Sequence, residues 1–164
     1  MQLMADCLVI GYGNTLRSDD AAGQRVAEIV AEWNLEHVRS LPVHQLTPEL
    51  AEPLSRAQLA IFIDVYVAIG DVAEVQVIEL TPLLSPAPIL GIGHTADPRS
   101  LLTLAQQLYG AVSPSWWILI PAINFEFGEH LSAVTQAGME VALEQVKQLL
   151  QASKTEDYPS TGKY

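Results

Sequence analysis

Three side chains that could bind a metal ion or activate a water molecule stand at the ends of strand-like segments. Asp20 follows the first apolar run of the chain, Asp64 ends the most apolar run, and His94 lies in a loop after a later run. Because ligands of open α/β sheets bind beyond the carboxyl ends of the strands, the three residues are expected at one edge of the sheet. Two carboxylates and one imidazole suit a divalent transition metal, and they can also hold and polarise a water molecule for peptide hydrolysis.

Each acid also has a structural interpretation of its own. Asp19 or Asp20 would cap a helix that begins at Ala21, because a side-chain oxygen there accepts hydrogen bonds from the first free N–H groups. Capping requires only one of the pair. It leaves Asp64 unexplained, since that acid stands in "FIDVYV" among large apolar side chains, where an unpaired carboxylate is costly. The convergence of Asp20, Asp64 and His94 therefore favours a site.

The loop "GYGNTLRSDD" offers phosphate binding as an alternative. It contains Gly11 and Gly13, but Leu16 stands where a dinucleotide fingerprint has its third glycine, and the loop has no lysine. Asp19 and Asp20 would also meet a pyrophosphate with like charge at the start of the helix. These features argue against a nucleotide site.

Other hydrolase and metal motifs are missing from the sequence. It has no G-x-S-x-G around Ser18 or Ser132 and no H-E-x-x-H, which argues against a serine triad and a zincin-type site. Cys7 is the single cysteine, so neither a disulfide framework nor a cysteine-based metal motif is possible. We expect Cys7 to be a buried structural thiol.

Predicted strands and helices alternate along the chain, and their arrangement determines where the candidate site residues lie. Apolar and alternating patterns predict strands over residues 7–11, 37–46, 59–65, 74–80 and 115–121, with Pro42 placing the second toward an edge. Helical spacing and capping residues predict helices over 22–33, from 47, over 97–109 and over 139–150, with a loop over 81–93. The predicted fold is an α/β three-layer sandwich: a mostly parallel, twisted five-stranded sheet with helices on both faces. Residues 1–152 are expected to form a single domain and residues 153–164 a flexible C-terminal tail.

Composition and charge argue against several kinds of partner. The 164-residue chain carries a net charge of −11 with eight Lys and Arg residues, which argues against nucleic acid and against an anionic membrane surface. No apolar stretch reaches the roughly 18 residues that span a bilayer. The N-terminal "MQLMAD" lacks the charged and apolar regions of a signal peptide. We expect a monomer in the cytoplasm.

The segment "GYGNTLRSDDAAG" resembles the G-x-G-N-x-L-x-x-D-[DE]-x-x-G signature of the hydrogenase maturation endopeptidases. The resemblance extends through "IFIDVYVAIG", "GIGHTADPRSLL" and "WWILIPAINFEFGEHLSAV", and so covers nearly the whole chain to about residue 150. It implies a cytoplasmic enzyme that trims the C-terminal extension from the large-subunit precursor of nickel–iron hydrogenases. It also implies a twisted sheet between helices.

The resemblance also implies roles for individual residues. Asp20, Asp64 and His94 match the family's nickel-sensing ligands, and the two aspartates are the candidate catalytic carboxylates. Asp20 often corresponds to a glutamate in the family and is one methylene shorter. The motif residues Gly11, Gly13 and Asn14 are then loop-forming. No tightly bound cofactor is implied: the precursor brings the nickel, and other divalent cations can occupy the site.

One segment departs from the pattern of many family members. Where these carry an aspartate and glycines before the threonine of the second strand-to-helix turn, this chain reads "VHQLTPEL". This resembles the branch that processes bidirectional, NAD-linked hydrogenases. We therefore predict that His44, Gln45 and Leu46 recognise the substrate, whereas His37 and His130 are surface or structural residues.

The sequence leaves two questions open. Hydrolysis by an aspartic-type pair, Asp20 and Asp64, and water activation at the metal both fit these residues. A non-enzymatic nickel chaperone that uses the same Asp, Asp and His ligands is the alternative to an endopeptidase.

Overall fold

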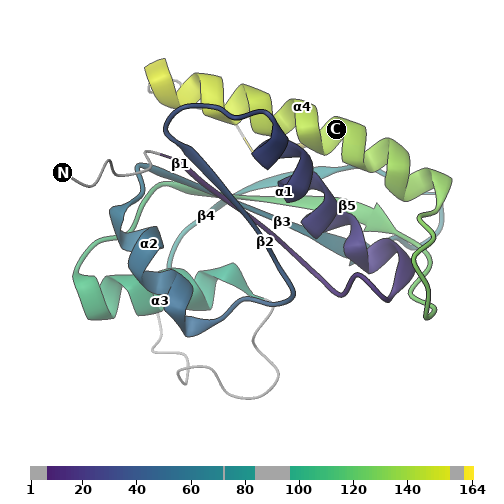
Figure 1. Cartoon of the computed structure of the whole chain (residues 1–164), viewed down its shortest axis with the longest axis horizontal. Helices are drawn as coiled ribbons and strands as arrows, with labels where there is room; N and C mark the ends of the chain where they lie inside the picture. Colours follow the sequence, from purple (N-terminus) through teal and green to yellow (C-terminus); the bar gives the residue numbers. More distant parts are fainter. Residues whose placement is uncertain (1–6, 72, 84–96, 156–160) are drawn as a thin grey trace.

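The computed structural model describes residues 7–71, 73–83, 97–155 and 161–164. They form three layers, in which α1 (Ala22–Glu32) and α4 (Ala133–Thr155) cover one face of a sheet. The other face is covered by α2 (Ala51–Arg56) and α3 (Pro98–Tyr109), as Figure 1 shows. The predicted α/β architecture with helices on both faces is confirmed. His94 lies outside the described residues, so the structure does not test its place.

The sheet has six strands in the described residues, not the five that the patterns predict. Their spatial order is β2-β1-β3-β5-β4-β6. Their bounds are β1 Cys7–Tyr12, β2 Val38–Val43, β3 Leu59–Val67, β4 Gln76–Leu80, β5 Ser115–Ala122 and β6 Gly162–Lys163. The first four strands in the spatial order are parallel, and β4 and β6 run antiparallel to their neighbours. As predicted, β2 with Pro42 lies at an edge.

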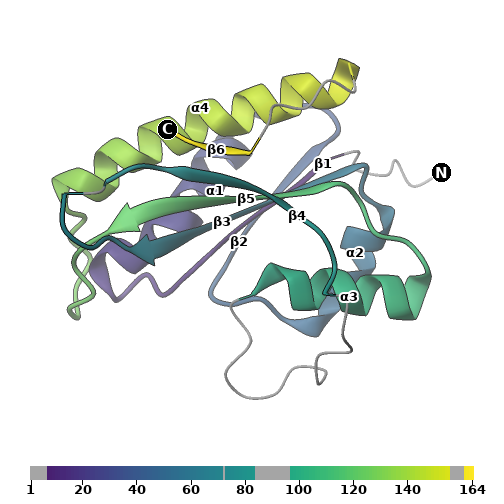
Figure 2. The same ribbon diagram turned by 180° about the vertical axis from the view of Figure 1, so that it is seen from behind.

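The sixth strand corrects the prediction of a flexible tail over residues 153–164. Residues 153–155 continue α4, and Gly162–Lys163 pairs with β4. Tyr164 and Val75 also exchange backbone hydrogen bonds of 2.8 Å in both directions. Figure 2 shows β6 beside β4 at the sheet edge. A two-residue strand has no periodicity of its own, and it forms here because the outer edge of β4 offers free backbone groups.

Alternation along β3 determines which side chains reach each face of the sheet. Leu59, Ile61 and Ile63 belong to the core under α1 and α4, whereas Ala60 and Phe62 belong to the core under α2 and α3. The same two-residue period directs the side chain of Asp64, the next residue on this face after Phe62, toward the α2–α3 side. The pairing of β3 within the sheet thus fixes the position of one carboxylate.

The helix boundaries follow local signals in part, with two departures. Asp97 caps α3 as predicted, since its Oδ1 accepts a hydrogen bond of 2.9 Å from the Arg99 backbone N–H. Thr47 precedes a 3₁₀ turn over Pro48–Leu50 that leads into α2, but its side chain makes no capping hydrogen bond. The last helix begins at Ala133, earlier than the predicted Met139.

Candidate functional site

A pocket of about 220 Å³ lies at the carboxyl ends of β1, β2 and β3. The strand order reverses beside β1, because β2 lies on one side of it and β3 on the other, and such a switch point is where open α/β sheets bind their ligands. The pocket is lined by Tyr12, Gly13, Asn14, Asp20, His44, Gln45 and Asp64. The structure therefore brings together both predicted carboxylates and two of the three predicted recognition residues.

The glycine loop fixes the place of Asp20. Gly13 has a φ of 145°, and a Cβ at this position would collide with the backbone carbonyl oxygen of Asp20. The Asp20 carboxylate in turn accepts a hydrogen bond of 2.8 Å from the Asn14 backbone N–H. Gln24 closes the loop from α1 by donating to the Gly13 carbonyl oxygen at 2.7 Å. The predicted loop-forming roles of Gly13 and Asn14 thus have a physical basis: they hold one carboxylate in the pocket.

Two further glycines let α1 start directly against the sheet. A Cβ on Gly11 would collide with the carbonyl oxygen of Gly23, and a Cβ on Gly23 would lie 2.5 Å from the carbonyl oxygens of Tyr12 and Ile63. Only glycine at both positions permits this approach. The short 3₁₀ helix Ser18–Ala21 that carries Asp20 is held close to the strand ends as a result.

Asp19 has a different role from its neighbour. It is fully buried, and its carboxylate accepts hydrogen bonds from the backbone N–H groups of Ile123, Asn124 and Ser132 at 3.0, 2.9 and 2.7 Å. The Ser132 hydroxyl donates a fourth, at 2.8 Å. Burial alone would raise the pKa of Asp19, but these hydrogen bonds outweigh it and lower the pKa below its usual value. Neither Asp19 nor Asp20 caps α1, which has no side-chain cap, so the capping interpretation is wrong.

Asp64 is the most perturbed acid of the pocket. Burial raises its pKa to about 7, and the negative charge of Asp20 adds to the increase. Hydrogen bonds from the Val65 backbone N–H and from the Tyr12 side chain act in the opposite direction. Both protonation states of Asp64 are therefore accessible near neutral pH, which is the property required of a residue that exchanges protons during hydrolysis.

Tyr12 is a pocket residue that the sequence patterns missed. Its side chain is 3% exposed, packs in the core under α2 and α3, and hydrogen-bonds Asp64. Burial and the nearby Asp64 charge raise its pKa well above the usual value, so the phenol is neutral and donates this hydrogen bond. The available signal was a polar aromatic residue at the end of an apolar strand, which on its own is indistinguishable from a core residue.

The recognition residues predicted after β2 divide into two groups. His44 and Gln45 are exposed and line the pocket. Leu46 is 3% exposed and packs in the core under α2 and α3, and it does not line the pocket. His37 and His130 are exposed and lie outside the pocket.

The part of the chain that the structure describes contains no group of three or more His, Cys, Asp or Glu side chains placed to hold a metal ion. Asp20 and Asp64 thus supply two carboxylates, which is too few for a closed metal site. Further ligands would have to come from a bound partner or from residues outside the described ranges.

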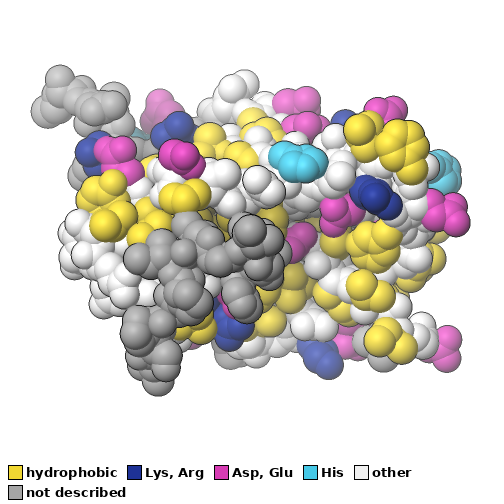
Figure 3. Space-filling view, turned by 90° about the horizontal axis from the view of Figure 1, so that it is seen from below, with side chains coloured by type: hydrophobic (Ala, Val, Ile, Leu, Met, Phe, Trp, Pro, Cys, Tyr) yellow, Lys and Arg dark blue, Asp and Glu magenta, His cyan; other side chains and the backbone are white. Residues whose placement is uncertain are grey.

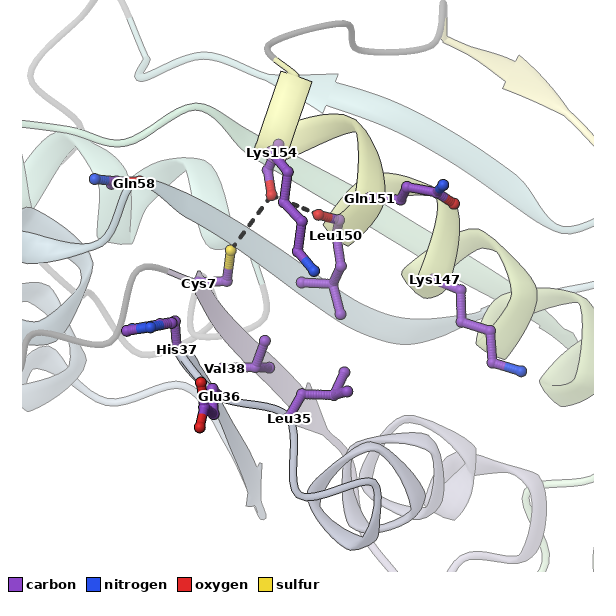
Figure 4. Close-up of a pocket in the computed structure, with 11 residues that line it drawn as sticks. Cys7, Leu35, Glu36, His37, Val38, Gln58, Lys147, Leu150, Gln151 and Lys154 are labelled. Atoms are coloured by element: carbon purple, nitrogen blue, oxygen red, sulfur yellow. Dashed lines mark hydrogen bonds between the residues drawn. The ribbon is translucent and has the colours of Figure 1, made fainter.

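A larger cavity, of about 880 Å³, lies at the opposite end of the sheet, between the α1–β2 connection and the last turns of α4. Figure 4 shows Cys7 at its wall, with Sγ 3.6 Å from the Ser153 hydroxyl oxygen. Lys147 and Lys154 line it from α4, and Glu36 is its one carboxylate among the described residues. The cavity thus lacks the paired acids of the smaller pocket.

The carboxyl end of the sheet also carries large exposed apolar side chains. Leu16, Val67, Ile69, Ile123 and Phe127 are 47, 64, 82, 57 and 80% exposed, and all follow or end β1, β3 or β5. On the face seen in Figure 3, hydrophobic side chains are exposed on both halves, and on the right half, which is this end of the sheet, Asp and Glu side chains lie among them. Such a surface beside a pocket is typical of a protein that docks another protein.

Solved structures of hydrogenase maturation proteases share this fold. The chain is 22% identical to HybD from Thermococcus kodakarensis, a [NiFe] hydrogenase maturation protease, with a TM-score of 0.66 over 87% of this chain and 97% of that one. It is 19% identical to the hydrogenase maturating endopeptidase HybD from E. coli, with a TM-score of 0.63 over 96% and 95%. It is 20% identical to a hydrogenase 2 maturation peptidase from a Thaumarchaeota archaeon, with a TM-score of 0.63 over 88% and 97%. No family model and no curated protein matches the chain.

Among the described residues, no helix is long and apolar enough to cross a membrane.

Proposed function

We propose that this protein is an endopeptidase that removes the C-terminal extension from the nickel-loaded large-subunit precursor of a [NiFe] hydrogenase. The observation that carries the proposal is the meeting of Asp20 and Asp64 in one pocket at the switch point of the sheet. The protein shares its fold with solved structures of hydrogenase maturation proteases. The four sequence segments that resemble this family support the same function.

In this proposal the precursor brings the nickel, held by its own cysteines. Asp20, Asp64 and His94 then add ligands to an ion that is already bound. Recognition depends on the metal because, without it, the pocket presents acids whose charges repel one another.

For the chemistry, we propose that a carboxylate of the pair acts as general base. Water attacks the carbonyl carbon of the scissile peptide bond, and its proton passes to the carboxylate, which later returns it to the leaving amine as the C–N bond breaks. The pKa of Asp64, raised to about 7, supports this residue in the proton-carrying role. The nickel of the precursor would polarise the carbonyl or the water.

We propose further that His44 and Gln45 select the precursor, and that the substrate belongs to a bidirectional, NAD-linked hydrogenase. Both side chains are exposed at the pocket and follow the edge strand β2. Neither is required for the proton transfers above. The protein would act as a monomer in the cytoplasm, where the precursor receives its nickel.

The test is to incubate the purified protein with nickel-loaded and with nickel-free precursor and to measure the mass of the precursor. The proposal expects loss of a C-terminal fragment from the nickel-loaded form alone. Transfer of nickel without any shortening would contradict it and would identify a nickel chaperone. Asp71→Asn is the control variant, because Asp71 is an exposed acid in a turn and does not line the pocket.

A further inference from the structure

Tyr12, the last residue of β1, and Asp64, in the carboxyl-terminal half of β3, lie side by side on adjacent parallel strands. The register of β1 and β3 pairs Gly11 with Ile63, so the next residues of the two strands are neighbours on the same face of the sheet. Both side chains line the pocket, and the Tyr12 phenol is hydrogen-bonded to the Asp64 carboxylate. The contact is therefore built into the strand pairing.

The ring and the hydroxyl of Tyr12 do different things. The ring belongs to the core under α2 and α3, where any aromatic side chain of this size would fill the same space. The hydroxyl is the polar end, and it reaches the carboxylate. Phenylalanine would keep the packing of the ring and remove the hydroxyl with its contacts to Asp64 and Trp117, so the contributions of ring and hydroxyl can be separated.

Among the residues that the structure describes, the Val65 backbone N–H and the Tyr12 side chain hydrogen-bond to Asp64. The first comes from its own strand and cannot by itself stop the carboxylate from rotating about its side-chain bonds. The second comes from a neighbouring strand and a buried ring, which has little freedom to follow such a rotation. Groups that hydrogen-bond a ligating carboxylate orient it and adjust its affinity for a cation.

We propose that Tyr12 is a positioning residue: its hydroxyl holds the Asp64 carboxylate in the orientation in which it accepts a cation entering the pocket. The inference rests on the proposed function in one respect, that this pocket accepts a divalent cation. It adds Tyr12 to the site, a residue to which the motif resemblance assigns no role.

The test compares the full-length protein with Tyr12→Phe and Tyr66→Phe by calorimetric titration with cadmium alone. Tyr66 is the matched control, since its hydroxyl also donates a hydrogen bond, of 2.6 Å to the Glu74 carbonyl oxygen, but outside the pocket. We expect Tyr12→Phe to weaken cadmium binding by about 10-fold or more, the usual effect of losing such a supporting hydrogen bond. Tyr66→Phe should bind as the wild type does.

A spectroscopic readout separates positioning from a structural role. Cadmium binding changes the charge felt by the Tyr12 phenol, so the wild type and Tyr66→Phe should show a tyrosine near-ultraviolet difference spectrum that Tyr12→Phe lacks. Wild-type affinity and an unchanged difference spectrum in Tyr12→Phe would overturn the role of Tyr12 while leaving the proposed function standing. A wild-type protein that binds no cadmium would instead contradict the cation pocket, and the inference with it.

Discussion

Asp20, on the short 3₁₀ helix after β1, and Asp64, in the carboxyl-terminal half of β3, reach one pocket, and the charge of the first contributes to raising the pKa of the second to about 7. The two acids also have different hydrogen-bond partners: Asp20 accepts a hydrogen bond from the Asn14 backbone N–H, whereas Asp64 accepts from the Val65 backbone N–H and from the Tyr12 side chain. A pair of carboxylates with different environments can divide the roles of anion and proton carrier between them.

Replacing either carboxylate by its amide should stop precursor processing. Asn keeps the volume of Asp but loses the charge that coordinates a metal and the ability to take a proton. We expect Asp20→Asn and Asp64→Asn to reduce the rate of processing by at least about 100-fold, the usual contribution of a general base. The measurement is the mass of the precursor over time, with Asp71→Asn as control. A variant that processes at the normal rate would remove that residue from the site.

The raised pKa of Asp64 also predicts how stability depends on pH. Its folded-state pKa of about 7 exceeds the usual value of about 3.9 in an unfolded chain, so the folded state holds the proton more tightly. The resulting stabilisation is fully present below about pH 4 and is lost as the pH rises through about 7. Asp64→Asn should therefore raise the free energy of unfolding by about 1–3 kcal/mol at pH 8 and change it little at pH 4.

Urea unfolding of the wild type and Asp64→Asn across this pH range measures the difference. Asp71→Asn should follow the wild-type curve, because Asp71 is exposed. Equal pH profiles for the wild type and Asp64→Asn would show that burial does not perturb this acid.

We expect the buried Asp19 carboxylate to stabilise the folded state. Its carboxylate accepts three backbone N–H groups, and the single carbonyl oxygen of Asn would leave at least one of them facing an NH₂ donor. Asp19→Asn should lower the free energy of unfolding by about 2–3 kcal/mol at pH 7. Because the pKa of Asp19 is lowered, this loss should shrink as the acid is protonated below its usual pKa. Thermal and urea unfolding of the wild type and Asp19→Asn measure this difference. A change in the free energy of unfolding of less than about 0.5 kcal/mol would contradict a stabilising role of these hydrogen bonds.

The sequence predicted the residues of this site where local patterns determine their position. The apolar run from Leu59 predicts a buried strand that carries Asp64, although β3 continues past this acid to Val67. The glycine turn after β1 predicts that Asp20 follows at the sheet edge. Asp97 likewise caps α3, because capping depends on the two residues that follow it. In each case the determining contacts lie within a few residues along the chain.

What the sequence did not predict depends on contacts between distant segments. Asp19 has the pattern of a helix cap, but its partners lie more than a hundred residues away in the chain. Tyr12 meets Asp64 only because β1 pairs with β3, and β6 exists only because β4 has a free edge. Leu46 shares a segment with two pocket residues but turns into the core.

The place of Leu46 changes the experiment that tests substrate choice. Replacing the whole segment by Asp-Gly-Gly would remove a buried side chain, at a cost of several kcal/mol. The exchange should therefore be limited to His44→Asp and Gln45→Gly. We expect this double variant to slow processing of the native precursor at least about 10-fold, since a missing recognition contact is worth roughly 1–3 kcal/mol. The affinity for cadmium should change less than about threefold, because both predicted carboxylate ligands remain. Loss of cadmium with unchanged precursor choice would make His44 a ligand instead.

The last prediction concerns the protons that a cation must displace. His94 must be neutral to coordinate a metal, and an unperturbed histidine has a pKa of about 6.5. Asp64 must be ionised, and its pKa is raised to about 7. Cadmium binding should therefore release protons from both residues near neutral pH, and affinity should fall as the pH decreases from about 8 to about 5.5.

Calorimetry in buffers of different ionisation enthalpy counts these protons. His94→Ala should bind cadmium with fewer released protons than the wild type but not with none, because Asp64 still has to lose its own. His37→Ala is the matched control, since His37 is an exposed histidine outside the pocket, and it should release as many protons as the wild type. Equal release from the wild type and His94→Ala would remove His94 from the site. Complete loss of release in His94→Ala would instead show that Asp64 is already ionised before the cation binds.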